Sequence, residues 1–213
     1  ATAPETDQGA GVCVGRPIEG IEVRIIQISD EPITEWADIL RAAPREIGEI
    51  IVSGAVVTRE YYQRPESTAL AKIVDAEGRL FHRMGDLGYF DAEGRLWMCG
   101  RKSQRVVTSG KTYFTIPCER IFNTHPKVRR TALVGVRGGD AGACLAVLCV
   151  ELNKGIPRPE QEVIRREPIA QAEANEITRG IRQVLFHPEF PVDIRHNAKI
   201  FREKLAVWAE RKL

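Results

Sequence analysis

The sequence has no apolar run long enough to cross a membrane. Its longest uninterrupted apolar stretch covers residues 143–150, whereas a membrane-spanning helix needs roughly 20 such residues. Its first residues, ATAPETDQGAG, contain neither the basic segment nor the apolar segment of a secretory signal. We therefore expect a cytoplasmic protein without a transmembrane segment. The missing initiator Met predicts that the chain is a fragment of a longer protein.

The sequence also has little net charge of either sign. Its 31 Lys and Arg residues face 29 Asp and Glu residues, which leaves a formal net charge of +2 over 213 residues. A dedicated nucleic-acid binder usually has a strong basic excess or a basic stripe with interleaved aromatic residues. We expect no nucleic-acid partner. With 43% hydrophobic and 28% charged residues, the composition is that of an ordinary globular protein.

The five cysteines lack the spacing of a metal site or of a disulfide framework. No C-x-x-C pair occurs, and an odd number cannot all pair within one chain. We interpret the cysteines as reduced and mostly buried thiols, which fits a cytoplasmic protein, and we expect no metal ligands here. The five are Cys13, Cys99, Cys118, Cys144 and Cys149.

Several common catalytic motifs are missing as well. The sequence contains no G-x-S-x-G, H-E-x-x-H or G-x-G-x-x-G. Gly110-Lys111-Thr112 ends like a phosphate-binding loop, but the glycine needed five positions earlier is Arg105. The valines at 106 and 107 predict a strand there instead. Motif spacing alone therefore offers no complete catalytic site.

What is present predicts two unequal parts. Residues 20–99 contain strand patterns, two of them introduced by the same Asp-Ala-Glu-Gly turn at residues 75–78 and 91–94, which predicts a small antiparallel sheet or barrel. Residues 30–45 give no clear prediction. The fold class is α+β. In the second part we expect a hairpin at 101–114, a helix at 117–123, buried strands at 131–136 and 145–152, one or two surface helices within 159–186, and a terminal amphipathic helix at 200–213.

Three polar residues follow glycine or precede a helix where a ligand could reach them. Asp86 follows Gly85 at a predicted strand end, where its carboxylate could accept two hydrogen bonds from a sugar diol or could cap a turn. Arg101 follows Gly100 and could bind the same ligand or a phosphate, or be a solvated surface residue. Lys199 precedes the last helix and could neutralise a phosphate, or be one of many basic residues near the chain end.

Three ordered motifs resemble the AMP-forming adenylating superfamily, which includes acyl-CoA synthetases, peptide-synthetase adenylation domains and luciferases. Residues 84–101, MGDLGYFDAEGRLWMCGR, resemble its T-G-D…D-x-x-G-x-x-x-x-x-G-R signature. Residues 108–128, TSGKTYFTIPCERIFNTHPKV, are similar to its S-G-x-x-I-x-P-x-E-I-E segment, and residues 196–202, HNAKIFR, to its S-G-K-I-x-R motif. Residues 100–122 resemble more closely the β-lactone synthetases of bacterial long-chain olefin biosynthesis, many of which are labelled fatty-acid CoA ligases.

The resemblance implies the C-terminal portion of an ATP-dependent ligase, inactive without the N-terminal portion of the same enzyme. Residues 1–100 would be the β-rich, distorted-barrel end of the large N-terminal domain, and residues 101–213 the small mobile C-terminal α+β domain. The enzyme would adenylate a long-chain fatty acyl or β-hydroxy acyl carboxylate with ATP and release pyrophosphate. It would then pass the acyl group to CoA or close it to a β-lactone. Mg²⁺ would be held chiefly by residues outside this chain.

The resemblance also assigns a role to each matching position. Asp86 would hold the ribose hydroxyls of ATP, and Arg101 would contact the same nucleotide. Lys199 would bridge the substrate carboxylate and the α-phosphate as the adenylate forms. Ser103 would be the hinge residue, where the family usually has Asp or Lys. Gly110 would lie on the loop that faces the site in the second half-reaction.

Two alternatives remain open. A basic cluster after the predicted helix could contact CoA phosphates or be a solvated surface: Lys127, Arg129 and Arg130. The chain could also be a non-catalytic binding module that reuses the fold. The presence of all three candidate site residues argues against that module, because a degenerate copy has no physical need to keep them together.

Overall fold

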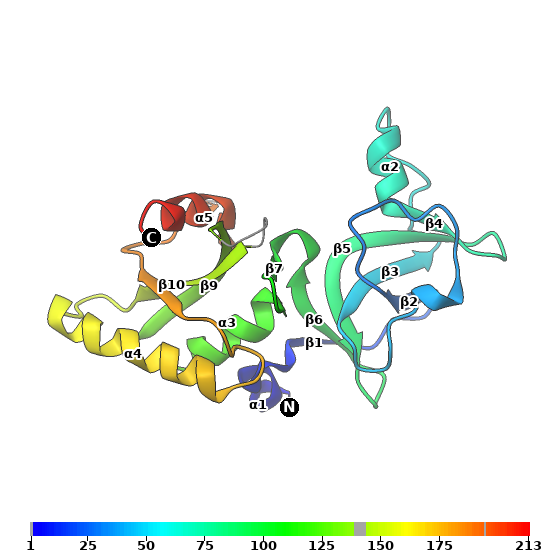
Figure 1. Ribbon diagram of the computed structural model, residues 1–213. Helices are drawn as coiled ribbons and strands as arrows, with labels where there is room; N and C mark the ends of the chain where they lie inside the picture. The colour runs from blue at the N-terminus through cyan, green and yellow to red at the C-terminus, as the bar shows by residue number, and fades with distance from the viewer. Residues whose placement is uncertain (1, 139–143, 194) are drawn as a thin grey trace. The chain divides into compact units, whose positions relative to one another are not determined.

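The computed structural model describes residues 2–138, 144–193 and 195–213 (Figure 1). They form two compact units, one of residues 11–103 and one of residues 104–213 together with 1–10. The chain passes from one unit to the other between Ser103 and Gln104. The assignment of residues 1–100 and 101–213 to two domains of an adenylating enzyme stays a prediction. In the described part of the chain, no helix combines the length and apolar character needed to cross a membrane.

The unit of residues 11–103 is built on one antiparallel sheet, as the sequence predicts. Its strand order is β1-β6-β5-β3-β2, and β4 pairs with β5. The order places β5 beside β6, so that residues 86 and 101 lie on neighbouring strands. The elements are β1 (Val12–Gly15), β2 (Ile21–Ile26), a 3-10 helix (Asp38–Leu40), β3 (Gly48–Gly54), α2 (Pro65–Ala71), β4 (Lys72–Val74), β5 (Leu80–Phe90) and β6 (Leu96–Arg101).

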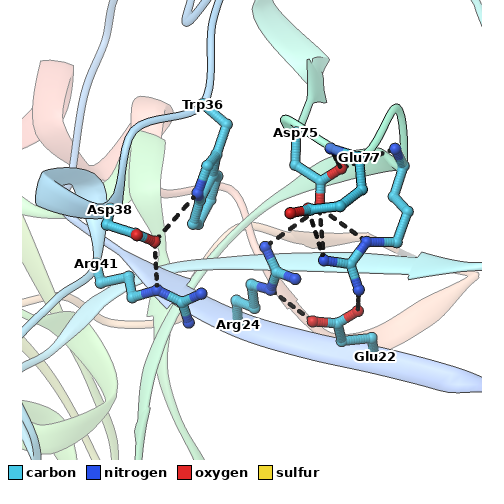
Figure 2. A network of polar contacts seen from close by, with 8 residues as sticks. Glu22, Arg24, Trp36, Asp38, Arg41, Asp75 and Glu77 are labelled. Atoms are coloured by element: carbon cyan, nitrogen blue, oxygen red, sulfur yellow. Dashed lines mark hydrogen bonds and ion pairs between the residues drawn. The ribbon is translucent and has the colours of Figure 1, made fainter.

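The loop between β2 and β3, which has no clear sequence pattern, is held to the sheet by stacked side chains (Figure 2). The Arg24 guanidinium lies 4.9 Å from the ring centroid of Trp36 and 4.3 Å from that of Phe81. It pairs with Glu22 at 2.5 Å and lies 3.6 Å from the Asp75 carboxylate. Because a buried charge needs partners, Arg24 can occupy this position under Trp36 only with both carboxylates present.

The two Asp-Ala-Glu-Gly turns adopt the same structure, which confirms the turn prediction. In each, the Asp Oδ1 atom accepts a hydrogen bond from the backbone N–H two residues on and from the one four residues on. Gly78 and Gly94 have φ values of 76° and 73°, a left-handed conformation that favours glycine. In the second turn, Trp97 Nε1 also donates to Asp91 Oδ2 at 2.7 Å. These turns fix where β5 and β6 begin.

Replacing Asp91 by alanine is expected to lower the melting temperature, because three backbone and side-chain donors of Arg95 and Trp97 lose their acceptor. Although burial by itself would raise the pKa of this carboxyl, hydrogen bonds from Trp97 and Arg95 hold that pKa well below its ordinary value. The stabilisation is therefore present above the ordinary Asp pKa of about 4 and fades as the pH falls below it. Thermal melts near pH 7 and near pH 3 check this, with Glu19→Ala as the exposed control. Equal melting temperatures at neutral pH would contradict it.

The second unit has helices on both faces of a three-stranded sheet ordered β11-β10-β9. Strand β10 is antiparallel to β9 and parallel to β11. The elements are α1 (Ala3–Glu5), a helical turn (Thr6–Ala10), a 3-10 helix that begins at the unit boundary (Lys102–Gln104), β7 (Val106–Val107), β8 (Thr112–Tyr113), α3 (Thr115–Asn123), β9 (Val128–Arg137), β10 (Cys144–Leu152), α4 (Arg158–Ala174), β11 (Gln183–Phe186), β12 (Val192–Asp193), β13 (His196–Ile200) and α5 (Arg202–Glu210).

Alternate residues of β10 face two separate cores. Leu148 and Val150 belong to a cluster that includes residues of α3 and α4, whereas Val147 and Cys149 belong to one that includes Leu205 of α5. Figure 1 shows α3 and α4 on one side of this sheet and α5 on the other. A strand buried on both faces reads as a continuous apolar run, which is why the sequence predicts β10 so clearly. The α+β class is confirmed.

One expectation for this unit is wrong in part. The segment 159–186 contains one helix, α4, but ends in a strand, β11, whose Val184 pairs with Leu148. Four residues are too few to show an alternating pattern, and the pairing partner is distant in sequence, so helical spacing was the stronger local signal. Three of the five cysteines, Cys99, Cys118 and Cys149, are buried, as predicted.

Candidate active site

Asp86 and Arg101 meet across two neighbouring strands. They are register partners in the β5–β6 pair, and Arg101 Nε lies 3.1 Å from Asp86 Oδ1. Arg101 ends β6, as expected, but Asp86 lies inside β5 and not at a strand end. The expectation is corrected because Gly85, with φ of 68°, bends the strand without ending it. The register then shifts between Leu87 and Gly88.

The Asp86 carboxylate is poorly satisfied for a buried group. Its side chain is 14% exposed, whereas that of Arg101 is 56% exposed. Within the part of the chain that the structure describes, the buried Oδ1 atom has an ion pair but no hydrogen bond of adequate geometry. Burial raises the pKa of this carboxyl, and the Arg101 charge offsets only part of that rise. Because an unsatisfied buried acceptor is unfavourable, hydroxyl donors from a ligand would be bound strongly here.

The residue after Arg101 is held in the interior instead. Lys102 Nζ lies 3.1 Å from Glu49 Oε1 and donates to the Ser29 carbonyl at 2.8 Å. Glu49 also pairs with Arg83 at 2.7 Å, and both of those side chains are only 1% exposed. The side chains of two successive residues thus have different partners: Arg101 pairs with Asp86, whereas Lys102 pairs with the buried Glu49. Together they anchor the chain just before it leaves the first unit.

The sequence did not predict the buried cluster of Lys102, Glu49 and Arg83. Glu49 lies in the otherwise apolar strand β3, and an acidic residue within a buried-strand pattern was the one available signal. Ser103, the expected hinge, is exposed and is the last residue of the first unit. Its position at the unit boundary is consistent with a hinge, and the role stays a prediction.

The Gly110 loop joins the two strands of a short hairpin. Val106 pairs with Tyr113, which agrees with the predicted hairpin and with the absence of a phosphate-binding loop. A Cβ atom at Gly110 would meet nothing within 4 Å. Thr108 Oγ1 accepts a hydrogen bond from the Lys111 N–H at 3.1 Å and so shapes the turn. The hairpin itself therefore does not require glycine at 110, which leaves close approach to a ligand as its predicted role.

Lys199 lies on β13, near the start of α5. Its neighbour Ile200 pairs with Val192 of β12. The Lys199 side chain is exposed, and among the described residues no carboxylate pairs with it. Lys199 lies on the unit that also carries Gly110, whereas Asp86 and Arg101 lie on the other unit.

Comparisons with known proteins identify the family. An olefin beta-lactone synthetase of Stenotrophomonas maltophilia (strain K279a) is 50% identical over 216 residues, which cover 100% of this chain and 38% of that protein. A protein of the same name from Xanthomonas campestris pv. campestris gives the same identity and coverage. The crystal structure of ATP-bound MatB from Rhodopseudomonas palustris matches with a TM-score of 0.73 at 21% identity, over 93% of this chain and 36% of that one. The chain belongs to the AMP-forming adenylating superfamily.

The resemblance of the sequence motifs to this superfamily is thereby confirmed, and the chain corresponds to its C-terminal portion. The chain spans 38% of the length of the two curated relatives. No protein-family model matches the chain. The fold agrees with that of the adenylating structures, but their identities to this chain are too low to assign a substrate.

Each residue of the basic cluster predicted either to contact CoA, the thiol acceptor of many superfamily members, or to form a solvated surface has a carboxylate partner. Arg129 Nη1 lies 2.7 Å from Glu151 Oε1, and Arg130 Nη2 lies 2.8 Å from Glu151 Oε2. Lys127 pairs with Glu160. Glu151 is buried and shared by the two arginines, so that the cluster keeps one positive charge beyond its carboxylate partners. Both interpretations of the cluster, a contact for CoA phosphates and a solvated surface, stay predictions.

Proposed function

We propose that this chain is the C-terminal part of an ATP-dependent, AMP-forming enzyme that converts a long-chain β-hydroxy carboxylic acid to a β-lactone. The observation that carries the proposal is the buried, incompletely hydrogen-bonded Asp86 beside Arg101 in a chain that is 50% identical to two olefin beta-lactone synthetases. A non-catalytic module would gain nothing from keeping such an unfavourable carboxylate.

Asp86 and Arg101 would bind the nucleotide. The carboxylate would accept hydrogen bonds from the two ribose hydroxyls, which satisfies its buried oxygen, and Arg101 would hold the carboxylate in place while contacting the same nucleotide. Because Asp86 is paired with Arg101 in the register of β5 and β6, the acceptor is positioned before the ligand arrives. Prepositioned acceptors bind with less loss of entropy.

Lys199 would act in the first half-reaction. The substrate carboxylate attacks the α-phosphorus of ATP, and the bond to the β-phosphate oxygen breaks as pyrophosphate leaves. This step brings negative groups together, so that an ammonium placed between them lowers the barrier. Lys199 is suited to this role because it is exposed, has no carboxylate partner among the described residues, and lies just before helix α5.

The second half-reaction would release AMP. The β-hydroxyl oxygen of the acyl-adenylate attacks the acyl carbon, the bond to the AMP oxygen breaks, and the hydroxyl proton passes to solvent. We assign the loop of Gly110 to this step. Ser103 would be the hinge about which the second unit turns, so that it presents a different face to the site in each half-reaction.

Among the described residues no group of three His, Cys, Asp or Glu side chains could hold a metal ion. Mg²⁺ on the ATP phosphates would need ligands elsewhere, and no step above depends on it. The reduced thiols fit a cytoplasmic location.

Product analysis tests the proposal. The full-length protein incubated with ATP, Mg²⁺ and a long-chain β-hydroxy acid, without CoA, is expected to give a β-lactone, AMP and pyrophosphate in equal amounts. The 213-residue chain alone is expected to give none, because the acyl pocket would lie outside it. An acyl thioester formed only when CoA is added would instead favour a CoA ligase, the name carried by a relative from Geobacillus kaustophilus that is 35% identical over 133 residues. No AMP under either condition would favour the non-catalytic module.

A further inference from the structure

A carboxylate and a guanidinium meet in the interior of the second unit, close in sequence to Lys199. Arg202 is the first residue of α5, and Glu119 lies in α3. Arg202 Nη2 donates to Glu119 Oε2 at 2.8 Å, and Nη1 donates to Oε1. The side chains are only 16% and 9% exposed. A two-pronged contact of this kind fixes the direction of the guanidinium as well as its distance.

Glu119 also binds the edge of the sheet. The Leu133 N–H of β9 donates to Glu119 Oε1 at 2.7 Å, and the Leu133 carbonyl accepts from Arg202 Nη1 at 3.3 Å. One carboxylate therefore joins α3, β9 and α5. Burial raises the pKa of Glu119, and the Arg202 charge and the Leu133 hydrogen bond act against that rise. The ionised form of Glu119 thus depends on Arg202.

In the part of the chain that the structure describes, the strand that carries Lys199 pairs with one other strand only. It belongs to a two-stranded ribbon in which β12 has only two residues and the register is irregular. An isolated ribbon of this size has little stability of its own. Just after Lys199 the chain becomes fixed: Ile200 packs against the core, the Phe201 N–H donates to the Pro191 carbonyl at 2.9 Å, and Arg202 binds Glu119.

We propose that Glu119 and Arg202 form a positioning pair for Lys199. The pair fixes the first turn of α5 and the end of β13, and so holds the Lys199 ammonium at the position that adenylate formation requires. Glu119 is buried, the Arg202 side chain is only 16% exposed, and each is the other's ion-pair partner, so the two would act through Lys199. This inference rests on the role given to Lys199 in the proposed function.

Separate assays of the two half-reactions in the full-length protein test the pair. Arg202→Lys keeps the charge but loses the two-pronged contact. Since a misplacement of about 1 Å can slow a reaction roughly 100-fold, we expect adenylate formation to fall by about 10-fold. The KM for ATP and the release of AMP from preformed acyl-adenylate should stay unchanged, because Lys199 acts only in the first step. A general loss of folded protein would instead lower both half-reactions equally.

Two further variants serve as controls. The double variant Lys199→Ala/Arg202→Lys is expected to form adenylate no more slowly than Lys199→Ala alone, because a positioning residue has no effect once its target is gone. Arg129→Met removes one partner of the other buried carboxylate of this unit, Glu151, and is expected to change the two half-reactions to the same extent. Should Arg202→Lys not fold, Glu119→Asp shortens the other partner while keeping its charge.

Four outcomes would overturn the pair's role. Equal slowing of both half-reactions by Arg202→Lys would show a purely structural contribution. Additive effects in the double variant would show that Arg202 acts independently of Lys199. Normal adenylate formation in Arg202→Lys, with slow formation in Lys199→Ala, would overturn the positioning role but keep the proposed function. Normal formation in Lys199→Ala would overturn both.

Discussion

Lys199→Ala in the full-length protein is expected to slow adenylate formation by about 10²–10³-fold, the usual effect of removing one group that stabilises developing charge. ATP affinity should change little, because the ammonium is needed mainly when the carboxylate approaches the α-phosphate. The exposed position of Lys199, without a carboxylate partner in the described part of the chain, means that its removal leaves no buried charge behind. The melting temperature should therefore stay the same.

Pyrophosphate release in a single turnover is the measurement for Lys199. Lys212→Ala is the matched control, because Lys212 is an exposed lysine near the end of the same unit. It should react at the parent rate. A rate of pyrophosphate release in Lys199→Ala equal to that of the parent would remove Lys199 from the mechanism. A large rise in the Kd for ATP at an unchanged rate would make it a binding residue only.

Asp86→Asn is expected to weaken ATP binding by about 10- to 100-fold, since a hydrogen bond to a charged group contributes roughly 1.5–3 kcal/mol. The same variant should melt at a higher temperature than the parent. Burial raises the pKa of Asp86 more than Arg101 lowers it, so that the ionised form is disfavoured in the folded state. The neutral amide removes that penalty. A fall in both affinity and stability would show that Asp86 is a structural residue.

The pH dependence gives a second test of Asp86. The carboxylate accepts hydrogen bonds from ribose only while it is ionised, and its folded-state pKa lies above the ordinary value. As the solution is acidified, ATP affinity should therefore begin to fall at a higher pH than it would if Asp86 had the ordinary pKa of an aspartate. Isothermal titration over a pH series checks this, and Asp86→Asn should lack the dependence. Asp38→Asn is the control, because its side chain is 85% exposed in the same unit.

The candidate site shows how far local patterns lead. The residue types and order around Asp86 and Arg101 predict a ligand-binding pair, and the structure places them as register partners. The sequence did not show that β5 continues through Asp86, because a glycine with a left-handed conformation can lie within a strand as well as end one. Nor did it show that Lys102, one residue further on, is drawn into the interior by Glu49. The direction of a side chain is decided by what surrounds it.

The sequence by itself determined the turns and the buried central strands. These depend on spacing over a few residues: the two Asp-Ala-Glu-Gly turns close their own hydrogen bonds, and β10 reveals its burial in one apolar run. Only the tertiary structure decided which charges are buried together. Glu119 and Arg202 are 83 positions apart, and Glu49 and Arg83 are 34 apart. Such pairs form because the folded chain removes both groups from water at one place, and no local spacing carries that information.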